Sequence, residues 1–388
     1  MREIDPRALD QHPDVIAARA RAAAAEAASA ESGSWPNPEL DGRVLFGEEG
    51  EEYEIAMQAA LPLGGRLGAE RQLARLELAL ARSSLRAARQ TARIELELAM
   101  TRLTWARVRR DHLEELATQS DQYAGYARER EATSVADPLE VSLVLADAAQ
   151  DRRAALRSLH DVTQAEWDLR QLLGQTVEIS PLPSRPLVGL RLSENAAMLL
   201  EGAREQCESW RQADLMLQHA EWDAARASRE RIPDLLIGPA VASDGVKTSL
   251  GLVLGWELPL FRSGSGAYRE ALARRDAAHG ALALEARAVR ARIETLVSRL
   301  RTLEAELQAL TRDAAPAAER AFALAQNRYA AGRIDVLHLL SAHRASAQSK
   351  LEILDVLLAQ RMTLLDLEGV VGRPIRTDPT PPIMEANP

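Results

Sequence analysis

Two histidines near the C-terminal end of the chain are candidate ligands for a metal ion. His338 and His343 are five residues apart, and this spacing places them on different faces of a helix. A zinc-binding pair on a helix is spaced by four residues, which brings both imidazoles to one face. We therefore expect His338 and His343 to be surface histidines, and we predict no metal site.

The other candidate chemistries also lack their patterns. The glycine-rich run Ser263-Gly264-Ser265-Gly266 has neither the lysine nor the βαβ context of a phosphate-binding loop. No local Ser-His-Asp grouping stands out, although such triads are scattered in sequence. The single cysteine, Cys207, excludes an intrachain disulfide and a multi-cysteine metal site. The sequence predicts no catalytic residue, no cofactor and no enzyme.

Charge and hydropathy exclude two further classes. The net charge is −9 over 388 residues, whereas a surface that binds nucleic acid needs a basic excess. No run of 18 or more apolar residues occurs, so the sequence predicts no transmembrane helix. The residues after Met1 lack the apolar stretch of a secretory signal peptide.

Three polar side chains, Glu54, Gln58 and Glu257, share one face of predicted strands whose other face is apolar. The sequence around them alternates with period two, which is typical of strands with one apolar and one polar face. The three side chains either line a water-filled lumen, where acidic rings favour cations, or are merely solvated. The apolar residues that alternate with them are Tyr53, Ile55, Met57, Ala59 and Leu61, then Leu250, Leu252, Leu254, Trp256 and Leu258.

The apolar strand faces need a cover. A hairpin packed on a soluble core gives the same alternation, but the long helices already bury their apolar stripes on one another. Four strands cannot close a barrel, because the smallest useful barrels have about eight, and an open sheet would leave two edges free to aggregate. A β-barrel shared among identical copies solves both problems, with eight strands from two chains or twelve from three.

Long helices position these strands, and the order of elements repeats. Leu61-Pro62-Leu63 and Leu258-Pro259-Leu260 each end a strand before a glycine-rich hinge and a long helix. Pro316 lies inside the last long helix and predicts a kink there. The predicted helices cover 6–34, 66–131, 139–173, 193–231, 267–329 and a return helix to 369, and the predicted strands cover 39–46, 52–63, 234–242 and 247–261.

The predicted fold is mainly α with a small β part. Two structural repeats, 1–178 and 193–372, each supply a long antiparallel helical hairpin and two strands. A proline-rich linker at 179–192 separates them, and we expect it to lack regular structure. The proline-rich tail at 373–388 is expected to be disordered.

The motifs, in this order and at repeat spacing, resemble those of the TolC family of outer-membrane factors, which serve tripartite efflux pumps and type I secretion. The resemblance extends from His12-Pro13 to Gly372. The turn at 130–140 resembles most the heavy-metal efflux branch, of the Czc and Cus type, except that Ser134 stands where the family usually has Gly. The matching motifs are Asn37-Pro38-Glu39-Leu40, Leu61-Pro62-Leu63-Gly64-Gly65-Arg66, Pro233-Asp234-Leu235, Leu258-Pro259-Leu260-Phe261, and Arg328-Tyr329-Ala330-Ala331-Gly332 with Leu340, Ala342 and Arg344.

The resemblance implies a homotrimer in the outer membrane of a Gram-negative bacterium, with a twelve-stranded β-barrel and a long periplasmic α-helical barrel. Its implied partners are outer-membrane lipid, a periplasmic adaptor and an inner-membrane RND-type pump, and its implied function is a passive conduit for metal cations or drugs. Arg333 and Asp335 would lie at the closed tip, although a helix cap explains Asp335 equally well. The remaining residues implied at the tip or the adaptor contact are Pro138, Glu140, Arg328, Tyr329, Gly332 and Leu337.

Two alternatives stay open from the sequence. A soluble coiled-coil scaffold or tether would use the two helical hairpins without a pore, and the missing leader favours it. A periplasmic adaptor of the same pumps would have one helical hairpin flanked by β-rich domains, whereas this chain has two hairpins and few strands. An exported family member needs a leader, so the start codon is misplaced, the leader lies outside this sequence, or this copy is not exported.

Overall fold

The computed structural model describes residues 10–47, 50–132, 137–173, 187–243, 247–256 and 264–379. These residues form two compact units, and each unit takes segments from both predicted repeats. Unit 1 comprises Met1–Val15, Arg89–Cys207 and Val289–Pro388, and unit 2 comprises Ile16–Ala88 and Glu208–Ala288. The two units therefore do not coincide with the predicted repeats at 1–178 and 193–372.

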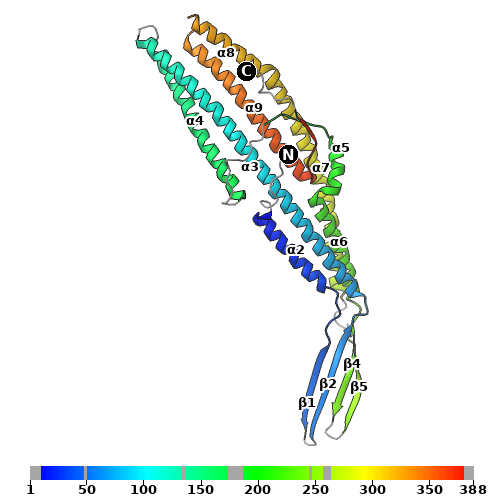
Figure 1. The fold of residues 1–388 in the computed structure, drawn as a ribbon. Helices are drawn as coiled ribbons and strands as arrows, with labels where there is room; N and C mark the ends of the chain where they lie inside the picture. The colour runs from blue at the N-terminus through cyan, green and yellow to red at the C-terminus, as the bar shows by residue number, and fades with distance from the viewer. Residues whose placement is uncertain are drawn as a thin grey trace. The chain divides into compact units, whose positions relative to one another are not determined.

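Unit 2 contains an antiparallel sheet of four strands in the order β1-β2-β4-β5 (Figure 1). The strands occupy Glu39–Gly47 (β1), Gly50–Leu61 (β2), Leu235–Ser243 (β4) and Thr248–Trp256 (β5). The sequence therefore predicted all four strands, and period-two alternation indicated β2 and β5. The last strand was expected to reach residue 261, but residues 257–261 lie outside the described part of the chain.

In the described part of the chain, four helices contribute to unit 2. They are α2 (Pro13–Glu31), the first part of α3 (Arg66–Ala132), α6 (Glu208–Arg229) and the first part of α7 (Ser265–Ala309). Ala224, Ala227 and Ala271 form a small core between α6 and α7, with Tyr268 and Leu272 packed against it. Alanines at these positions let the helices approach closely, so this unit needs few large side chains.

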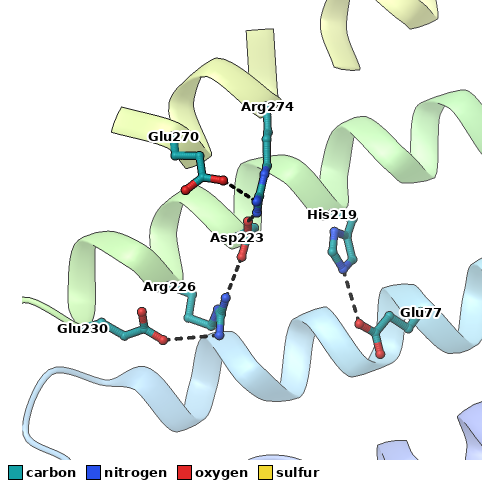
Figure 2. A network of polar contacts seen from close by, with 7 residues as sticks. All are labelled: Glu77, His219, Asp223, Arg226, Glu230, Glu270 and Arg274. Carbon is teal, nitrogen blue, oxygen red and sulfur yellow. Dashed lines mark hydrogen bonds and ion pairs between the residues drawn. The ribbon is translucent and has the colours of Figure 1, made fainter. Parts of the chain in front are cut away.

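A polar network also joins the helices of unit 2 (Figure 2). Asp223 of α6 lies between Arg226 of the same helix and Arg274 of α7, at 2.9 and 3.6 Å. On α3, Glu77 lies 3.5 Å from His219 of α6. Glu230 and Glu270 each pair with one of the two arginines. The network fixes which side of α6 faces α3 and which faces α7.

The two long helices that follow the strand pairs, α3 and α7, each begin directly after a glycine. Gly65 precedes α3 and Gly264 precedes α7, with φ of 69° and 66°. Residues with a Cβ rarely adopt this left-handed conformation, so glycine permits the sharp change of direction. The glycine-rich hinges expected from the sequence therefore occupy equivalent places in both halves.

Unit 1 contains the paired long helices. The second part of α3 packs antiparallel to α4 (Pro138–Leu173) through a core that includes Leu96, Leu103, Val162 and Leu169. The last helix, α9 (Val336–Val371), runs beside α8 (Ala315–Ala330) and also packs on α3 (Figure 1). Among the described residues, no helix has both the length and the apolar character needed to cross a membrane.

A π-helical turn interrupts the helix where the sequence predicted a kink. Leu310–Ala314 forms this turn between α7 and α8, and Pro316 follows it in the first turn of α8. Proline cannot donate a backbone hydrogen bond, and its ring crowds the preceding turn of helix. Proline and single π turns are both known causes of bends in helices, and here they occur together.

Two expectations from the sequence are wrong in part. The segment 193–231 was expected to be one helix, but α5 (Ala196–Gln206) ends at Cys207, whose ψ of 113° is extended, and α6 begins at Glu208. Strand β3 (Leu190–Leu192) pairs with β6 (Thr377–Pro379), so the linker and the tail are not wholly irregular. Residues 179–186 of the linker and 380–388 of the tail lie outside the described residues.

An ion pair explains why residues 373–379 are structured. The Arg373 guanidinium bonds both oxygens of the buried Glu194 carboxylate, and the backbone N–H of Arg376 donates to the same group. The Arg373 side chain lowers the pKa of Glu194 below its ordinary value. These partners are about 180 residues apart in sequence, so the local proline content could not reveal them.

Candidate functional site

The sheet of unit 2 has two chemically different faces, because opposite residues of antiparallel strands share a face. Glu54 lies opposite Arg43 on β1 and Ala242 on β4, and Gln58 lies opposite Glu39. The Nε2 of Gln58 donates to Oδ2 of Asp41 at 3.4 Å. The predicted residues Glu54 and Gln58 therefore lie together on a charged face, whereas Glu257 lies outside the described residues.

Toward the other edge of the sheet, on β4 and β5, the residues of this same face are mostly small and uncharged. Its members on β4 and β5 include Gly238, Ala240, Gly251 and Ser249. Gly238 has no room for a side chain, because a Cβ there would lie 1.6 Å from the carbonyl oxygen of Met57. We name this surface the polar face. Its described residues are Glu39, Asp41, Arg43, Glu52, Glu54, Ala56, Gln58, Ala60, Leu236, Gly238, Ala240, Ala242, Ser249, Gly251, Val253 and Gly255.

The opposite face is apolar and exposed. Leu250 is 83% exposed and Phe46 is 79% exposed, although side chains of this size usually stabilise a protein by leaving water. We name this surface the apolar face; its large exposed members are Leu40, Val44, Phe46, Tyr53, Ile55, Met57, Leu250, Leu252, Leu254 and Trp256. Ten such side chains on one side of a sheet require an apolar environment or a partner.

The two outer strands leave backbone groups free for pairing. Within the described chain, β1 pairs only with β2 and β5 pairs only with β4. Unpaired edge strands recruit further strands, and a sheet without closure or cover aggregates. The edges and the apolar face together indicate that the isolated chain is an incomplete assembly.

A second group of predicted residues comes together in unit 1, where α3, α4 and α9 meet. The core here contains Ala124, Val141, Val144, Val336 and Leu340, and the predicted residues Leu337 and Tyr329 pack against it. Glu140 of α4 accepts a hydrogen bond from the backbone N–H of Val336 at 3.1 Å. The first turn of α9 is thereby bonded to the first turn of α4.

Asp335 caps α9, and its side chain contacts His338 of the same helix. Its Oδ1 accepts from the backbone N–H of His338 at 3.0 Å and also contacts the His338 ring. These contacts to His338 lower the pKa of the Asp335 carboxyl. The cap alternative is therefore confirmed for Asp335, since a side-chain oxygen at this position satisfies an otherwise unpaired helix N–H.

The turn between α8 and α9 contains the other predicted residues. Gly332 has φ of 68°, and its N–H donates to the carbonyl of Tyr329 at 2.9 Å. The carbonyl of Arg328 accepts from the N–H of Arg333 at 2.8 Å, and both arginine side chains are exposed. The Tyr329 ring lies 5.9 Å below the guanidinium of Arg130 on α3. Pro138 is the exposed first residue of α4.

One group at this place was not predicted as a site. Arg344 of α9 lies 3.1 Å from Asp147 and 3.4 Å from Asp151 on α4. Asp151 is only 7% exposed and also accepts a hydrogen bond from Ser120 of α3 at 2.7 Å. The sequence did contain a signal for this group. Asp151 follows Val144 and Ala148 on the apolar stripe of α4, where a carboxylate needs a partner.

The expectation of two surface histidines is wrong for His343. His338 is exposed, but His343 is 5% exposed and lies between the rings of Tyr123 and Phe322, with centroids at 5.8 and 4.8 Å. The ring falls on the buried stripe of α9 with Leu340 and Ser346, which the spacing from His338 did not reveal. Across the described ranges, no group of three or more His, Cys, Asp or Glu side chains could hold a metal ion.

Comparison with known proteins agrees with this geometry. A family model described as "Outer membrane efflux protein" matches residues 199–373. A comparison with curated proteins finds no match. Among solved structures, the chain resembles VceC from Vibrio cholerae at 19% identity, with a TM-score of 0.79 and 94% of each chain covered.

Two further structures show the same likeness. CusC matches at 18% identity and a TM-score of 0.78, over 94% of this chain and 90% of CusC. The open state of MtrE from Neisseria gonorrhoeae matches at 17% identity and a TM-score of 0.76, over 94% of this chain and 87% of MtrE. At these identities the likeness establishes the fold, and the prediction of a mainly helical chain with two long hairpins and four strands is confirmed. The scores do not separate one branch of these channels from another.

Proposed function

We propose that this chain, whose residues 199–373 belong to the TolC-like outer membrane efflux protein family and whose fold is that of outer-membrane channels, is the channel component of a tripartite efflux system. Such a protein lies in the outer membrane of a Gram-negative bacterium and has a helical periplasmic part. It conducts its substrate without transforming it, so it is not an enzyme.

The observation that carries the proposal is the two-faced sheet. An exposed apolar face suits the hydrocarbon of a membrane, and a charged or small face suits a water-filled lumen. At roughly 25 cal/mol per Å² of apolar surface removed from water, contact of these ten large side chains with lipid favours a position of the sheet in the membrane. A soluble scaffold or a periplasmic adaptor would leave the apolar face without a partner.

The free edges indicate how the sheet is completed. Three copies of the four-stranded sheet would give twelve strands, with β5 of one copy pairing with β1 of the next, and a closed barrel has no free edge. The TolC-like channels form trimers in efflux systems, which supports this stoichiometry. Glu54, Gln58 and the neighbouring Asp41 would then repeat three times around the lumen.

The cargo proposed from these residues is cationic. Four carboxylates, those of Glu39, Asp41, Glu52 and Glu54, lie on the polar face. Two basic side chains, Arg43 and Lys247, lie beside Glu52 and Glu54, so acidic groups are in excess, and an acidic lining favours cations over anions. Metal cations of the Czc and Cus type fit this lining, as do protonated drugs. The turn at 130–140 favours metals, although its residues 133–136 lie outside the described part of the chain.

The hairpin tips would serve as the gate and the adaptor contact. Contacts of Glu140 with Val336 and of Arg344 with Asp147 and Asp151 connect the α8–α9 hairpin to α4, so breaking them would let the hairpins part. Arg328, Tyr329, Gly332, Arg333 and Leu337, together with Pro138, would present the surface that meets a periplasmic adaptor and, through it, an RND-type inner-membrane pump.

The test is extraction of the full-length protein from outer membranes in mild detergent, followed by native mass measurement and planar-bilayer recording. We expect a trimer mass and cation-selective channels. The variant Glu54→Gln with Asp41→Asn should lower cation selectivity, whereas Glu77→Gln on α3 should not change it. A monomer in the soluble fraction, without channel activity, would contradict the proposal.

A further inference from the structure

Unit 1 contains a cavity that the proposed function does not use. It has a volume of about 190 Å³ and lies between α3, α8 and α9. Its apolar side includes Leu116, Phe322 and Leu351. Its polar side includes His112, Glu115, Glu319, His343 and Lys350.

His343 is the buried polar group of this cavity. Its Nδ1 atom has no hydrogen-bond partner among the described residues, and its ring lies against Phe322 of α8 and Tyr123 of α3. One side chain of α9 therefore contacts both of the other helices. The donors around the cavity do not converge into a metal site within the described residues, so the ligand chemistry that remains is that of a proton and water.

Charged groups of both signs face the His343 ring. The carboxylates of Asp151 on α4 and Glu115 on α3 favour the protonated imidazolium, and cationic groups of α9 oppose it. Burial outweighs the carboxylates and lowers the pKa of His343 below its ordinary 6.5. Burial and the Lys350 ammonium lower the pKa of His112 in the same direction. The facing groups are Glu115 and His112 on α3, Asp151 on α4, Glu319 on α8, and Arg344 and Lys350 on α9.

We propose that His343 is a proton-operated switch, whose protonation separates the α8–α9 hairpin from α3 and so favours opening of the periplasmic tip in acid. The interpretation of this movement as channel opening rests on the proposed function. The separation of the α8–α9 hairpin from α3 does not depend on it. A periplasmic hairpin would experience the external pH directly, because protons cross the outer membrane through open pores.

The physical reason lies in the contacts of the ring. The neutral imidazole fits between two aromatic rings, whereas an imidazolium with an unpaired N–H needs water or a carboxylate. The Nδ1 atom is buried while the helices are packed together, so separation of the helices would give it access to water. Because the folded form binds this proton less readily than an exposed histidine, acid below about pH 6.5 favours conformations that expose the ring. The effect levels off below the pKa of the folded form.

The test uses the full-length protein in detergent, labelled at histidine for NMR and analysed by hydrogen exchange between pH 7.5 and 5. We expect the His343 resonance to titrate below 6.5 and the amides of α8 and the first half of α9 to lose protection in the same range. After correction for the intrinsic rate of exchange, the loss should be about tenfold for each unit by which the pKa is lowered.

Three variants separate His343 from the other histidines. His112→Phe removes the other histidine of the cavity and should leave most of the acid-induced loss of protection in place. His343→Phe keeps an aromatic ring between Tyr123 and Phe322 and should remove the acid-induced loss of protection. His160→Phe changes an exposed histidine of α4 and should leave the loss unchanged. If His343→Phe does not fold, the unmodified protein still decides: titration of His343 without any loss of protection in α8 and α9 overturns the switch.

Channel recordings keep the two proposals apart. A switch in a working channel predicts a higher open probability at pH 5 than at pH 7.5, absent in His343→Phe. Acid-induced loss of protection in a protein that never conducts would overturn the channel and leave the separation of the helices standing. A loss of protection that persists in folded His343→Phe would overturn the switch and leave the channel standing.

Discussion

Glu140 and Val336 are joined by a hydrogen bond of 3.1 Å from the Val336 backbone N–H to the Glu140 side chain. The two residues are 196 positions apart and belong to different hairpins. Val336 is the first residue of α9, whose N–H has no partner within its own helix. The Glu140 carboxylate therefore caps a helix of the other hairpin, and this contact gives the hairpins a defined relation at their tips.

Removing this bond should loosen the tip. We expect Glu140→Ala to destabilise the first turn of α9 by about 1 kcal/mol, because a helix N–H loses its acceptor. Hydrogen exchange of the amides at the start of α9 should become about fivefold faster. Glu140→Gln keeps an acceptor oxygen and should change exchange far less; equal effects of the two variants would show that the hydrogen bond contributes nothing.

The cluster around Arg344 should be more sensitive. Arg344→Met leaves the buried Asp151 carboxylate with Ser120 as its remaining partner, and we expect a loss of about 1–3 kcal/mol, reduced by the partial exposure of Arg344. The measurement is the thermal unfolding midpoint of the detergent-extracted protein. Asp151→Asn in the Arg344→Met background should restore part of the loss, since it removes the unpaired charge while an amide oxygen can still accept from Ser120. No recovery would contradict an ionic role for Asp151.

Two glycines of the polar face should differ in their tolerance of a larger side chain, because the space around them differs. Gly238→Val places a side chain where a Cβ would lie 1.6 Å from the Met57 carbonyl, and we expect the sheet not to assemble. Gly251, on the same face of β5, has only a distant contact at 4.0 Å, so Gly251→Val should assemble normally. The measurement is the yield of assembled protein in the outer-membrane fraction, and equal yields for the two variants would contradict the close approach.

Acid should release the strand pair β3–β6. The pKa of Glu194 is lowered by Arg373, so the pair contributes its full stability above the ordinary value of 4.5 and loses it as the pH falls through the lower pKa of the folded form. We expect limited proteolysis after residue 373 to increase below pH 4.5 and to be insensitive to pH in Glu194→Gln. As the pH falls, this effect begins at about 4.5, whereas that of His343 begins at about 6.5, so the two acid effects have different onsets.

The sequence predicted those elements that depend on local pattern. The strands follow from alternation at Tyr53 to Leu61 and from Leu250 to Trp256, and the long helices follow from the absence of proline between residues 66 and 131. The resemblance to outer-membrane efflux proteins also came from motifs at repeat spacing, and the family model matches residues 199–373. Local pattern sufficed because each of these elements has one dominant periodicity.

The features that the sequence did not predict depend on partners far away in the chain. β6 forms because Arg373 reaches Glu194, and His343 is buried because Tyr123 and Phe322 come from two other helices. The break at Cys207 leaves an extended residue between two helices, with no proline or glycine to mark it. Such contacts are set by packing, which a single sequence read along its length does not contain.

The most direct test of the central claim compares the two faces of β5 in the assembled protein. In a Cys207→Ser background, Leu252→Cys lies on the apolar face and Gly251→Cys lies on the polar face. We predict that the cysteine at position 252 reacts with a membrane-soluble maleimide and not with a charged one, and that the cysteine at position 251 reacts with the charged reagent. Equal reaction of both positions with the charged maleimide would contradict a sheet that faces lipid on one side and a water-filled channel on the other.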